Sequence, residues 1–432
     1  MKLASSHFIM FLLPFVVTPI LSRLYAPESF GEWGVFSSTY TILNVVLFLC
    51  YEYAIVKVRE SDYPNTCALC VAIAFAFIAV TSLVFIGGSL LGISFFEQFP
   101  CLLFFLSYLA ISALNTVLSN VANRHDRYWV MSVGSMVTGG LQAAFRIVFG
   151  VSVVFYNGLI AGTVFAMVAS TLFYMVCLYR YFNKDFFKQI SFSGMRCIAI
   201  DNKKFPLYDA PSTLLAMAAF NLPVIILAAY FSKADIGCFS IIIQLLLLPM
   251  SFIGSAIGRV YYRQITDVKA AKDTLVQSSQ LVLRLTSILA ILPMLFLSVG
   301  GDHLLVLFLG DKWSMAGSIA LCLSVWSLPT ILTQPLLPVF RALNMQDMML
   351  KYEGLYFLMG VGVLSISCAF GLSLCLCVLL FALACCVAKL LLFASLVKVS
   401  DVKLRKAFQP PLLAVYILTL TILSYRLYDI IF

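Results

Sequence analysis

The chain has 432 residues, of which 62% are hydrophobic and only 11% are charged, and its formal net charge is +9. Soluble domains carry about a quarter charged residues, and a soluble fold of this length could not bury so much apolar surface. The composition therefore excludes a water-soluble protein. The apolar residues occur in runs of roughly 20, long enough to cross a bilayer as helices, and they lack the alternation of an outer-membrane strand. We expect an all-α integral membrane protein.

The first half of the chain contains six predicted membrane-spanning helices. The first apolar run has the outline of a signal peptide, but Pro14, Pro19 and Arg23 fit a cleavable segment poorly, so we interpret it as a retained helix. A polar stretch at 180–206 follows the six helices, which are predicted at 5–23, 33–56, 66–93, 99–122, 129–150 and 153–179.

The second half contains seven predicted helices, at 207–231, 235–258, 275–300, 314–340, 352–371, 373–397 and 411–430. The apolar stretch at 302–310 is too short to cross the bilayer. The polar stretch thus separates two sets of six helices, and one further helix follows the second set. We predict four regions: an N-terminal six-helix bundle at 1–180, a cytoplasmic linker at 181–206, a C-terminal six-helix bundle at 207–397, and a cytoplasmic loop with the additional helix at 398–432.

The distribution of basic residues sets the orientation. With the N-terminus in the cytoplasm, 21 of the 28 Lys and Arg residues fall in cytoplasmic connections or at the N-terminus, and 4 fall outside. This bias is what the positive-inside rule predicts for correctly placed spans. We therefore predict a multi-pass protein of the bacterial inner membrane with a cytoplasmic N-terminus. The net charge reports orientation here, so we do not expect nucleic acid as a partner.

A short pattern recurs near the start of each half. Residues 24–31 read LYAPESFG and residues 230–237 read YFSKADIG: an aromatic residue, a turn, an acid, an apolar residue and a glycine. An even number of helices per half brings both halves into the membrane in the same direction, so they can be parallel pseudo-repeats. The first copy is then an extracytoplasmic hairpin between two helices, which carries Arg23 and Glu28.

Three basic residues fall inside predicted spans: Arg146 in the fifth, Arg284 in the ninth and Lys389 in the twelfth. An ionised side chain in mid-span costs a few kcal/mol, so those that persist normally face a bundle interior. Arginine forks match phosphate geometry, so we expect these cations to line the path of an anionic head group, in particular a diphosphate. For Lys389, snorkelling to the nearby cytoplasmic end is the alternative.

Two acidic residues lie close to the predicted cytoplasmic ends of spans. Glu52 lies near the end of the second predicted span, and Asp209 lies near the start of the seventh. Either residue is a candidate for ion coupling or gating, and either is equally compatible with a simple interfacial position.

The sequence lacks the usual signatures of soluble catalysis. It has no G-x-x-x-x-G-K-[ST] run, no H-E-x-x-H and no G-x-S-x-G, and its three histidines are scattered. The thirteen cysteines lie without nearby histidines, mostly in or beside apolar runs, and we interpret those as small membrane-compatible residues. We therefore expect no enzyme activity, no cofactor and no metal site.

Three stretches resemble the Wzx-type flippases that move polysaccharide repeat units. These flippases belong to the multidrug/oligosaccharidyl-lipid/polysaccharide (MOP) exporter superfamily. The matching stretches are PILSRLYAPESFGEWGVFSS followed by YEYAIV, the segment at 203–264 with Pro223-Val224 and GSAI before an aromatic-basic exit, and LGDKWSMAGSIALCLSVWSLPTILTQPLLPVF at 309–340. They appear in family order and cover most of the chain, although the thirteenth helix is additional to the twelve-helix core.

The resemblance implies two six-helix bundles around a central cavity and alternating access driven by an ion gradient. It implies a substrate, an oligosaccharide on an undecaprenyl diphosphate carrier, that moves from the inner to the outer leaflet for O-antigen lipopolysaccharide or capsule synthesis. Membrane lipid, a polysaccharide polymerase and a chain-length regulator are the partners it implies. Arg146 and Arg284 would then attract the diphosphate and the sugar head group.

Three other interpretations remain open. A MATE-like drug or cation antiporter of the same superfamily would favour acidic residues in mid-span, whereas the clear mid-span charges here are basic. A flippase for a peptidoglycan lipid precursor shares the anionic lipid but usually has more helices. A membrane enzyme such as an O-antigen polymerase or ligase needs a large extracytoplasmic loop, and no predicted outside connection is long enough.

Overall fold

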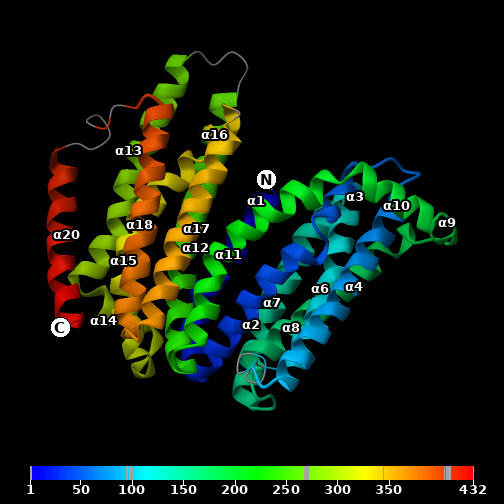
Figure 1. The fold of residues 1–432 in the computed structure, drawn as a ribbon, viewed down its shortest axis with the longest axis horizontal. Helices are drawn as coiled ribbons and strands as arrows, with labels where there is room; N and C mark the ends of the chain where they lie inside the picture. Colours follow the sequence, from blue (N-terminus) through cyan, green and yellow to red (C-terminus); the bar gives the residue numbers. More distant parts are fainter. Residues whose placement is uncertain are drawn as a thin grey trace. The chain divides into compact units, whose positions relative to one another are not determined.

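The computed structural model describes residues 2–93, 96, 99, 101–266, 272–343, 345–402, 404 and 410–431. Over these residues every regular element is a helix. The helices belong to two compact units, Met1–Ile225 and Ile226–Phe432, which run from blue to green and from green to red in Figure 1. The expected all-α class with two helical units is confirmed. The boundary falls within α11 (Ala210–Ala228), and the four predicted regions stay a prediction.

Unit 1 contains the helices of the first half. In chain order they are α1 (Lys2–Leu24), α2 (Pro27–Leu47), η1 (Tyr51–Tyr53), α3 (Ala54–Lys57), α4 (Tyr63–Leu90), α6 (Leu102–Arg124), α7 (Tyr128–Ser152) and α8 (Gly158–Leu178). The motif that opens α2 has a physical reason. Pro27 occupies the first turn, where its missing N–H costs nothing, and the Glu28 carboxylate lies at the positive end of the helix dipole.

The polar linker is helical and packs on unit 1. It contains η2 (Tyr179–Tyr181), α9 (Lys184–Lys188), α10 (Phe192–Asp201) and the π-helical turn η3 (Phe205–Asp209) that leads into α11. Two side chains cap its helices: Asn183 accepts from the backbone N–H of Phe186, and Ser191 accepts from that of Gly194. In Figure 1, α9 and α10 lie beside the same ends of the unit 1 helices as α3.

Unit 2 contains α12 (Lys233–Thr266), α13 (Lys272–Phe296), η4 (Leu297–Gly301), α14 (Asp302–Leu309), η5 (Asp311–Trp313), α15 (Ser314–Thr333), η6 (Gln334–Leu336), α16 (Pro338–Ala342), α17 (Gln346–Ala369), α18 (Leu374–Val399) and α20 (Pro410–Ile431). The short apolar stretch after α13 is the separate helix α14. It begins after Gly300, whose φ of 128° is accessible to glycine at little cost.

The thirteenth predicted helix, α20, is fixed to unit 2 by polar contacts. Both terminal nitrogens of Arg426 donate to the Asp302 carboxylate, at 2.8 Å each. The Tyr416 hydroxyl donates to the carbonyl of Ser287 on α13. A bidentate arginine–carboxylate pair is among the stronger side-chain contacts and also fixes orientation.

Every one of the thirteen predicted segments is helical in the described residues. Eight helices there are long and apolar enough to cross a membrane, or nine if the bent pair of α2 with η1 and α3 counts as one span. The predicted fifth span, α7, is not among them. Its polar and small residues, together with Arg146, lower its hydropathy, so its place depends on neighbouring helices.

Close packing of α7 on α8 depends on two glycines four residues apart. A Cβ on Gly162 would lie 2.8 Å from the backbone nitrogen of Arg146, and one on Gly158 would lie 2.9 Å from the Cβ of Phe149. Only glycine permits this approach, which is the geometry of G-x-x-x-G contacts between membrane helices. The pair of glycines therefore sets where the backbone of Arg146 lies.

Candidate functional site

Arg146 lies inside unit 1 and is only 9% exposed. Its Nε donates to the carbonyl of Leu159 at 3.3 Å, and one terminal nitrogen donates to the Thr163 hydroxyl at 2.8 Å. Its guanidinium carbon lies 4.7 Å from the centre of the Trp33 ring, a cation–π distance. Within the described residues it makes no ion pair. A buried positive charge is thus held by neutral groups alone.

The hairpin between α1 and α2 also touches the Arg146 region. The Tyr25 hydroxyl donates to the carbonyl of Arg146 at 2.6 Å. Burial raises the pKa of Tyr25 to about 12, against the opposing effect of the Arg146 charge. The phenol therefore remains protonated near neutral pH and can keep donating this hydrogen bond. The neighbouring hairpin residues Arg23 and Glu28 are exposed, so the structure does not bring them to Arg146.

The sequence analysis missed a second polar group in unit 1. Glu32 in the first turns of α2 is buried. Its carboxylate accepts from the Tyr156 hydroxyl at 2.9 Å and from the Asn157 amide at 3.0 Å. Asn157 also caps α8 by accepting from the backbone N–H of Leu159. Glu32 stands one residue before the predicted second span, so the boundary hid it.

Lys389 lies inside unit 2, and it has an acidic partner. It is 3% exposed, and its Nζ is 3.7 Å from a carboxylate oxygen of Glu353 and 4.4 Å from the centre of the Tyr356 ring. Both partners lie in α17, whereas Lys389 is in α18. The sequence analysis did not name Glu353. Because this pair neutralises itself, Lys389 offers less attraction to an anion than Arg146 does.

Arg284 differs from both of these cations. It is exposed on α13, near the exposed apolar residues Leu281, Leu285 and Ile288. Its side chain makes no hydrogen bond or ion pair in the part of unit 2 that the structure describes. Of the three predicted path residues, Arg146 thus belongs to α7 of unit 1, whereas Arg284 and Lys389 belong to α13 and α18 of unit 2. Their role in a substrate path stays a prediction.

The second predicted span is broken near its C-terminal end. Between α2 and η1 the chain bends by 60°. Leu49 and Cys50 have left-handed backbone, with φ of 51° and 64°. This conformation is uncommon for residues other than glycine, asparagine and aspartate, and it stores strain. Pairs of strained residues of this kind cluster at functional sites.

The break places the two predicted coupling candidates near one another. Glu52 lies in η1 directly after the left-handed pair and is half-buried, and its Oε2 is buried without a hydrogen-bond partner. Asp209 ends η3 and is exposed. Both carboxylates lie within electrostatic reach of Tyr53 and of Cys50. Residues 157 positions apart in sequence thus share one end of unit 1.

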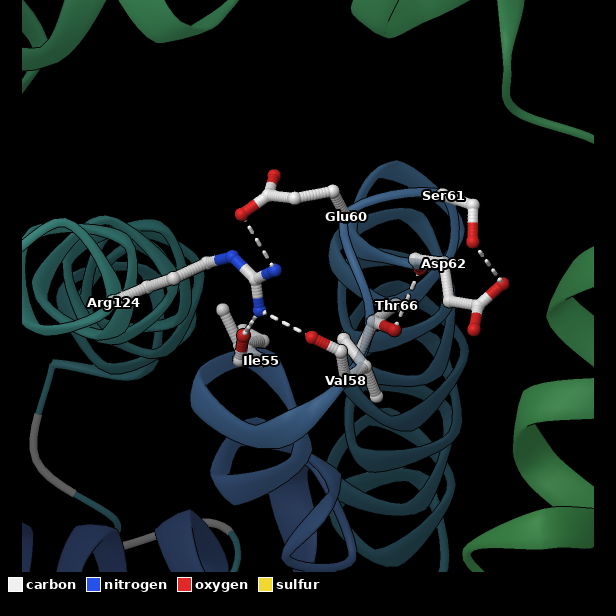
Figure 2. Close-up of polar contacts among 7 residues, drawn as sticks. All are labelled: Ile55, Val58, Glu60, Ser61, Asp62, Thr66 and Arg124. Carbon is white, nitrogen blue, oxygen red and sulfur yellow. Dashed lines mark hydrogen bonds and ion pairs between the residues drawn. The ribbon is translucent and has the colours of Figure 1, made fainter.

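Arg124, at the end of α6, holds the short helix after this break, as Figure 2 shows. One of its terminal nitrogens donates to the carbonyls of Ile55 and Val58, at 2.7 and 2.8 Å, and the other pairs with Glu60 at 3.0 Å. Its guanidinium also lies 4.8 Å from the centre of the Tyr63 ring. The last carbonyls of a helix lack internal partners and attract cations. Arg124 therefore fixes the geometry that presents Glu52.

Among the described residues no three His, Cys, Asp or Glu side chains lie together as a metal site would require. Cys67 and Cys70, the C-x-x-C of the sequence, are buried in the apolar core of unit 1. The candidate functional groups of the two units are therefore the charged side chains described above.

A family model described as "Polysaccharide biosynthesis protein" matches residues 20–318, well over half of the chain. The chain belongs to this polysaccharide biosynthesis family. A search of the curated proteins gave no match. Membership of the family, together with the candidate spans, makes this a multi-pass membrane protein.

This family member has the fold of MOP-superfamily transporters. The lipid II flippase MurJ in an inward closed conformation is 12% identical, with a TM-score of 0.73 over 98% of this chain and 91% of that one. An inward-facing MATE multidrug transporter is 16% identical, with a TM-score of 0.68 over 90% and 95%. A MOP transporter from Pyrococcus furiosus with a reversed binding-pocket polarity is 15% identical, with a TM-score of 0.55 over 93% of each chain. The expected fold is confirmed, and the Wzx-type assignment within that superfamily stays a prediction.

Proposed function

We propose that this protein is a flippase that moves an oligosaccharide repeat unit, linked to undecaprenyl diphosphate, across the bacterial inner membrane. The proposal joins the polysaccharide biosynthesis family to the fold of membrane transporters. It includes alternating access, an ion gradient as the energy source and a cytoplasmic N-terminus. The polymerase and the chain-length regulator of the same polysaccharide are the proposed partners.

The observation that carries the substrate class is the uncompensated charge of Arg146. Burying a cation without an acid is expensive, and the neutral groups around it return only part of that cost. An anionic ligand would supply the missing counter-charge, and a diphosphate would meet the guanidinium fork with paired oxygens. With 9% exposure Arg146 is not open to a large ligand in this conformation. Its engagement then accompanies a rearrangement of Trp33 or Thr163.

Ion coupling is assigned to the broken second helix. Glu52 has a buried oxygen without a partner, beside two strained residues. A carboxylate in that position gains from binding a proton or a small cation, and either change alters the charge that acts on Tyr53 and its surroundings. Asp209 is the second acid within that reach. We assign Glu52 the coupling role and Asp209 a supporting electrostatic role.

Replacing Arg146 by glutamine tests the proposal. The change keeps hydrogen-bonding groups and removes the charge. In cells that lack the native gene, Arg146→Gln should abolish surface polysaccharide while the lipid-linked repeat unit accumulates in the inner leaflet. Arg146→Lys should retain part of the export, because it keeps the charge but loses the fork. Protein level in the membrane is measured alongside each variant.

Lys389→Met combined with Glu353→Leu is the matched comparison, since it removes a buried cation together with the acid that neutralises it, and export should persist. Normal export by Arg146→Gln at native protein level would remove Arg146 from the substrate path. Accumulation of a peptidoglycan precursor in place of the repeat unit would reassign the substrate while leaving the flippase fold in place.

A further inference from the structure

The linker helices α9 and α10 present a surface that the proposed function does not use. One side of this pair is attached to unit 1. Asn65 on α4 donates to the carbonyl of Gln189 at 3.1 Å and accepts from the backbone N–H of Ser191 at 2.7 Å. The Tyr51 hydroxyl donates to the carbonyl of Ala199 at 2.9 Å. Side chains of unit 1 thus hold the backbone of the pair at the connection between α9 and α10 and near the end of α10.

Apolar packing completes this attachment. Phe186 of α9 is buried with its ring centre 5.3 Å from that of Tyr63, and Ile198 of α10 is buried. A Cβ on Gly194 would lie 2.8 Å from the side chain of Asn65, so α10 approaches α4 closely. The inward side of each linker helix thus already has its apolar partners.

The outward side of α10 is apolar as well, which a purely cytosolic helix does not need. Phe192 is 80% exposed and Ile200 is 56% exposed. Arg196 is exposed between them and makes no hydrogen bond or ion pair in the described structure. The spacing of four residues places these three side chains on one face. Phe187 of α9 adds a further exposed ring, at 60%.

Cations surround these apolar groups. The exposed basic residues of segment 183–204 outnumber its acidic residues five to two; they are Lys184, Lys188, Arg196, Lys203 and Lys204, against Asp185 and Asp201. Aromatic and aliphatic groups beside exposed cations characterise helices that lie in the headgroup region of a bilayer. Anionic lipids attract such cations at the cytoplasmic leaflet.

We propose that the outward face of α9 and α10 binds the anionic headgroups of the inner leaflet. The apolar side chains Phe187, Phe192 and Ile200 insert at the boundary of the acyl chains, while Arg196 and the neighbouring lysines contact lipid phosphates. Unit 1 is thereby anchored to the membrane surface through the linker as well as through its spans. This inference is independent of the substrate that the protein carries.

A label on Cys197 tests the proposal. Of the thirteen cysteines, this one alone is exposed in the described structure, and it follows Arg196 directly. The full chain carries a nitroxide there and is placed in nanodiscs of phosphatidylcholine, with or without phosphatidylglycerol. The measurement is the ratio of collisions with oxygen to collisions with a water-soluble nickel chelate. We expect the ratio to rise severalfold when phosphatidylglycerol is present.

Two double variants test the cations and the apolar side chains of this face separately. Lys188→Gln with Arg196→Gln should abolish most of the rise that phosphatidylglycerol causes, because each cation near an anionic surface strengthens binding by about fivefold. Phe192→Ser with Ile200→Ser should lower the ratio in both bilayers. Lys312→Gln, which removes an exposed charge from unit 2, should change nothing, and Cys197→Ser reports background labelling.

Two results would overturn the assignment. High nickel accessibility in both bilayers would place this face in water. Equal protection in both bilayers, unaffected by the Lys188 and Arg196 changes, would show insertion without recognition of anionic headgroups. Because every substituted side chain is exposed, the variants should fold normally, which size-exclusion chromatography checks.

Discussion

The two units bury a cation in different ways. In unit 1 the Arg146 guanidinium is surrounded by a carbonyl, a hydroxyl and the Trp33 ring, without a carboxylate. In unit 2 the Lys389 ammonium lies 3.7 Å from Glu353 and over the Tyr356 ring. The first arrangement retains a net charge and the second does not. Burial of a basic residue therefore does not by itself indicate an anion-binding site. The site can attract an anion only if no neighbouring carboxylate already neutralises the positive charge.

The largest expected effect is a loss of stability when the buried ion pair between Lys389 and Glu353 is broken. Removing one partner of a buried ion pair leaves an uncompensated charge, so Glu353→Gln should destabilise unit 2 by about 3 kcal/mol. Hydrogen–deuterium exchange resolved to the peptides of α17 and α18 measures the change, and the peptides of unit 1 serve as the internal reference.

A double variant sharpens this test. Lys389→Met combined with Glu353→Leu removes both charges and fills the space with apolar atoms, and it should recover most of the lost protection. If Glu353→Gln leaves α17 and α18 as protected as before, the pair contributes little. The contrast between the two units would then lose its basis.

A smaller effect is expected where α7 meets α8. Gly162→Ala places a methyl group against the backbone of Arg146 and should cost about 2 kcal/mol through overpacking. The same change at Gly140, on the other helix of the pair, meets nothing within 4 Å and should be neutral or slightly stabilising. Thermal unfolding of the purified variants compares them. Equal stability of both would contradict the close approach that positions Arg146.

The smallest expected effect is on the pH dependence of stability. We expect it for His125 of unit 1 and not for His303 of unit 2. Burial lowers the pKa of His125, with the charges of Arg124 and Arg127 acting in the same direction and those of Glu60 and Asp126 opposing them. The folded state then binds fewer protons than the unfolded chain, whose histidines titrate near about 6.5. The stability from His125 is complete above that pH and is lost as the pH falls through the folded pKa.

The measurement is the unfolding temperature between neutral and mildly acidic pH. His125→Phe keeps the stacking on Tyr181, whose ring centre is 3.9 Å away, and should flatten the pH dependence. His303 of unit 2 is 82% exposed, so His303→Phe should leave the dependence unchanged. An unaltered slope in His125→Phe would assign the acid sensitivity to another group.

The helices were predictable because a continuous apolar run of suitable length has few alternatives to a helix in a membrane. The break in the second span was not. No glycine or proline stands at Leu49 or Cys50, and the apolar run continues through both residues. The linker helices were also missed, because the polar stretch at 180–206 was interpreted only as a loop. The caps at Asn183 and Ser191 were the available signal.

For the candidate site, the sequence located the buried basic residues but not their partners. Mid-span cations are visible because they interrupt apolar runs. Which side chain meets them depends on the rotation of each helix about its axis, and two helices with weak amphipathic patterns leave that rotation open. The Glu353 contact with Lys389 joins residues 36 positions apart across two helices, and no spacing rule reaches so far.

The contact between Asp302 and Arg426 bears on how deletions of the last helix are interpreted. Without α20, the buried Asp302 carboxylate would lose both guanidinium hydrogen bonds, and its remaining ion-pair partner among the described residues would be the His303 ring at 3.8 Å. A chain shortened before Pro410 should therefore be less stable and reach a lower level in the membrane. Loss of surface polysaccharide in such a strain would then reflect a reduced amount of protein. Only substitutions in α20 that preserve the Asp302–Arg426 ion pair can show whether this helix takes part in export.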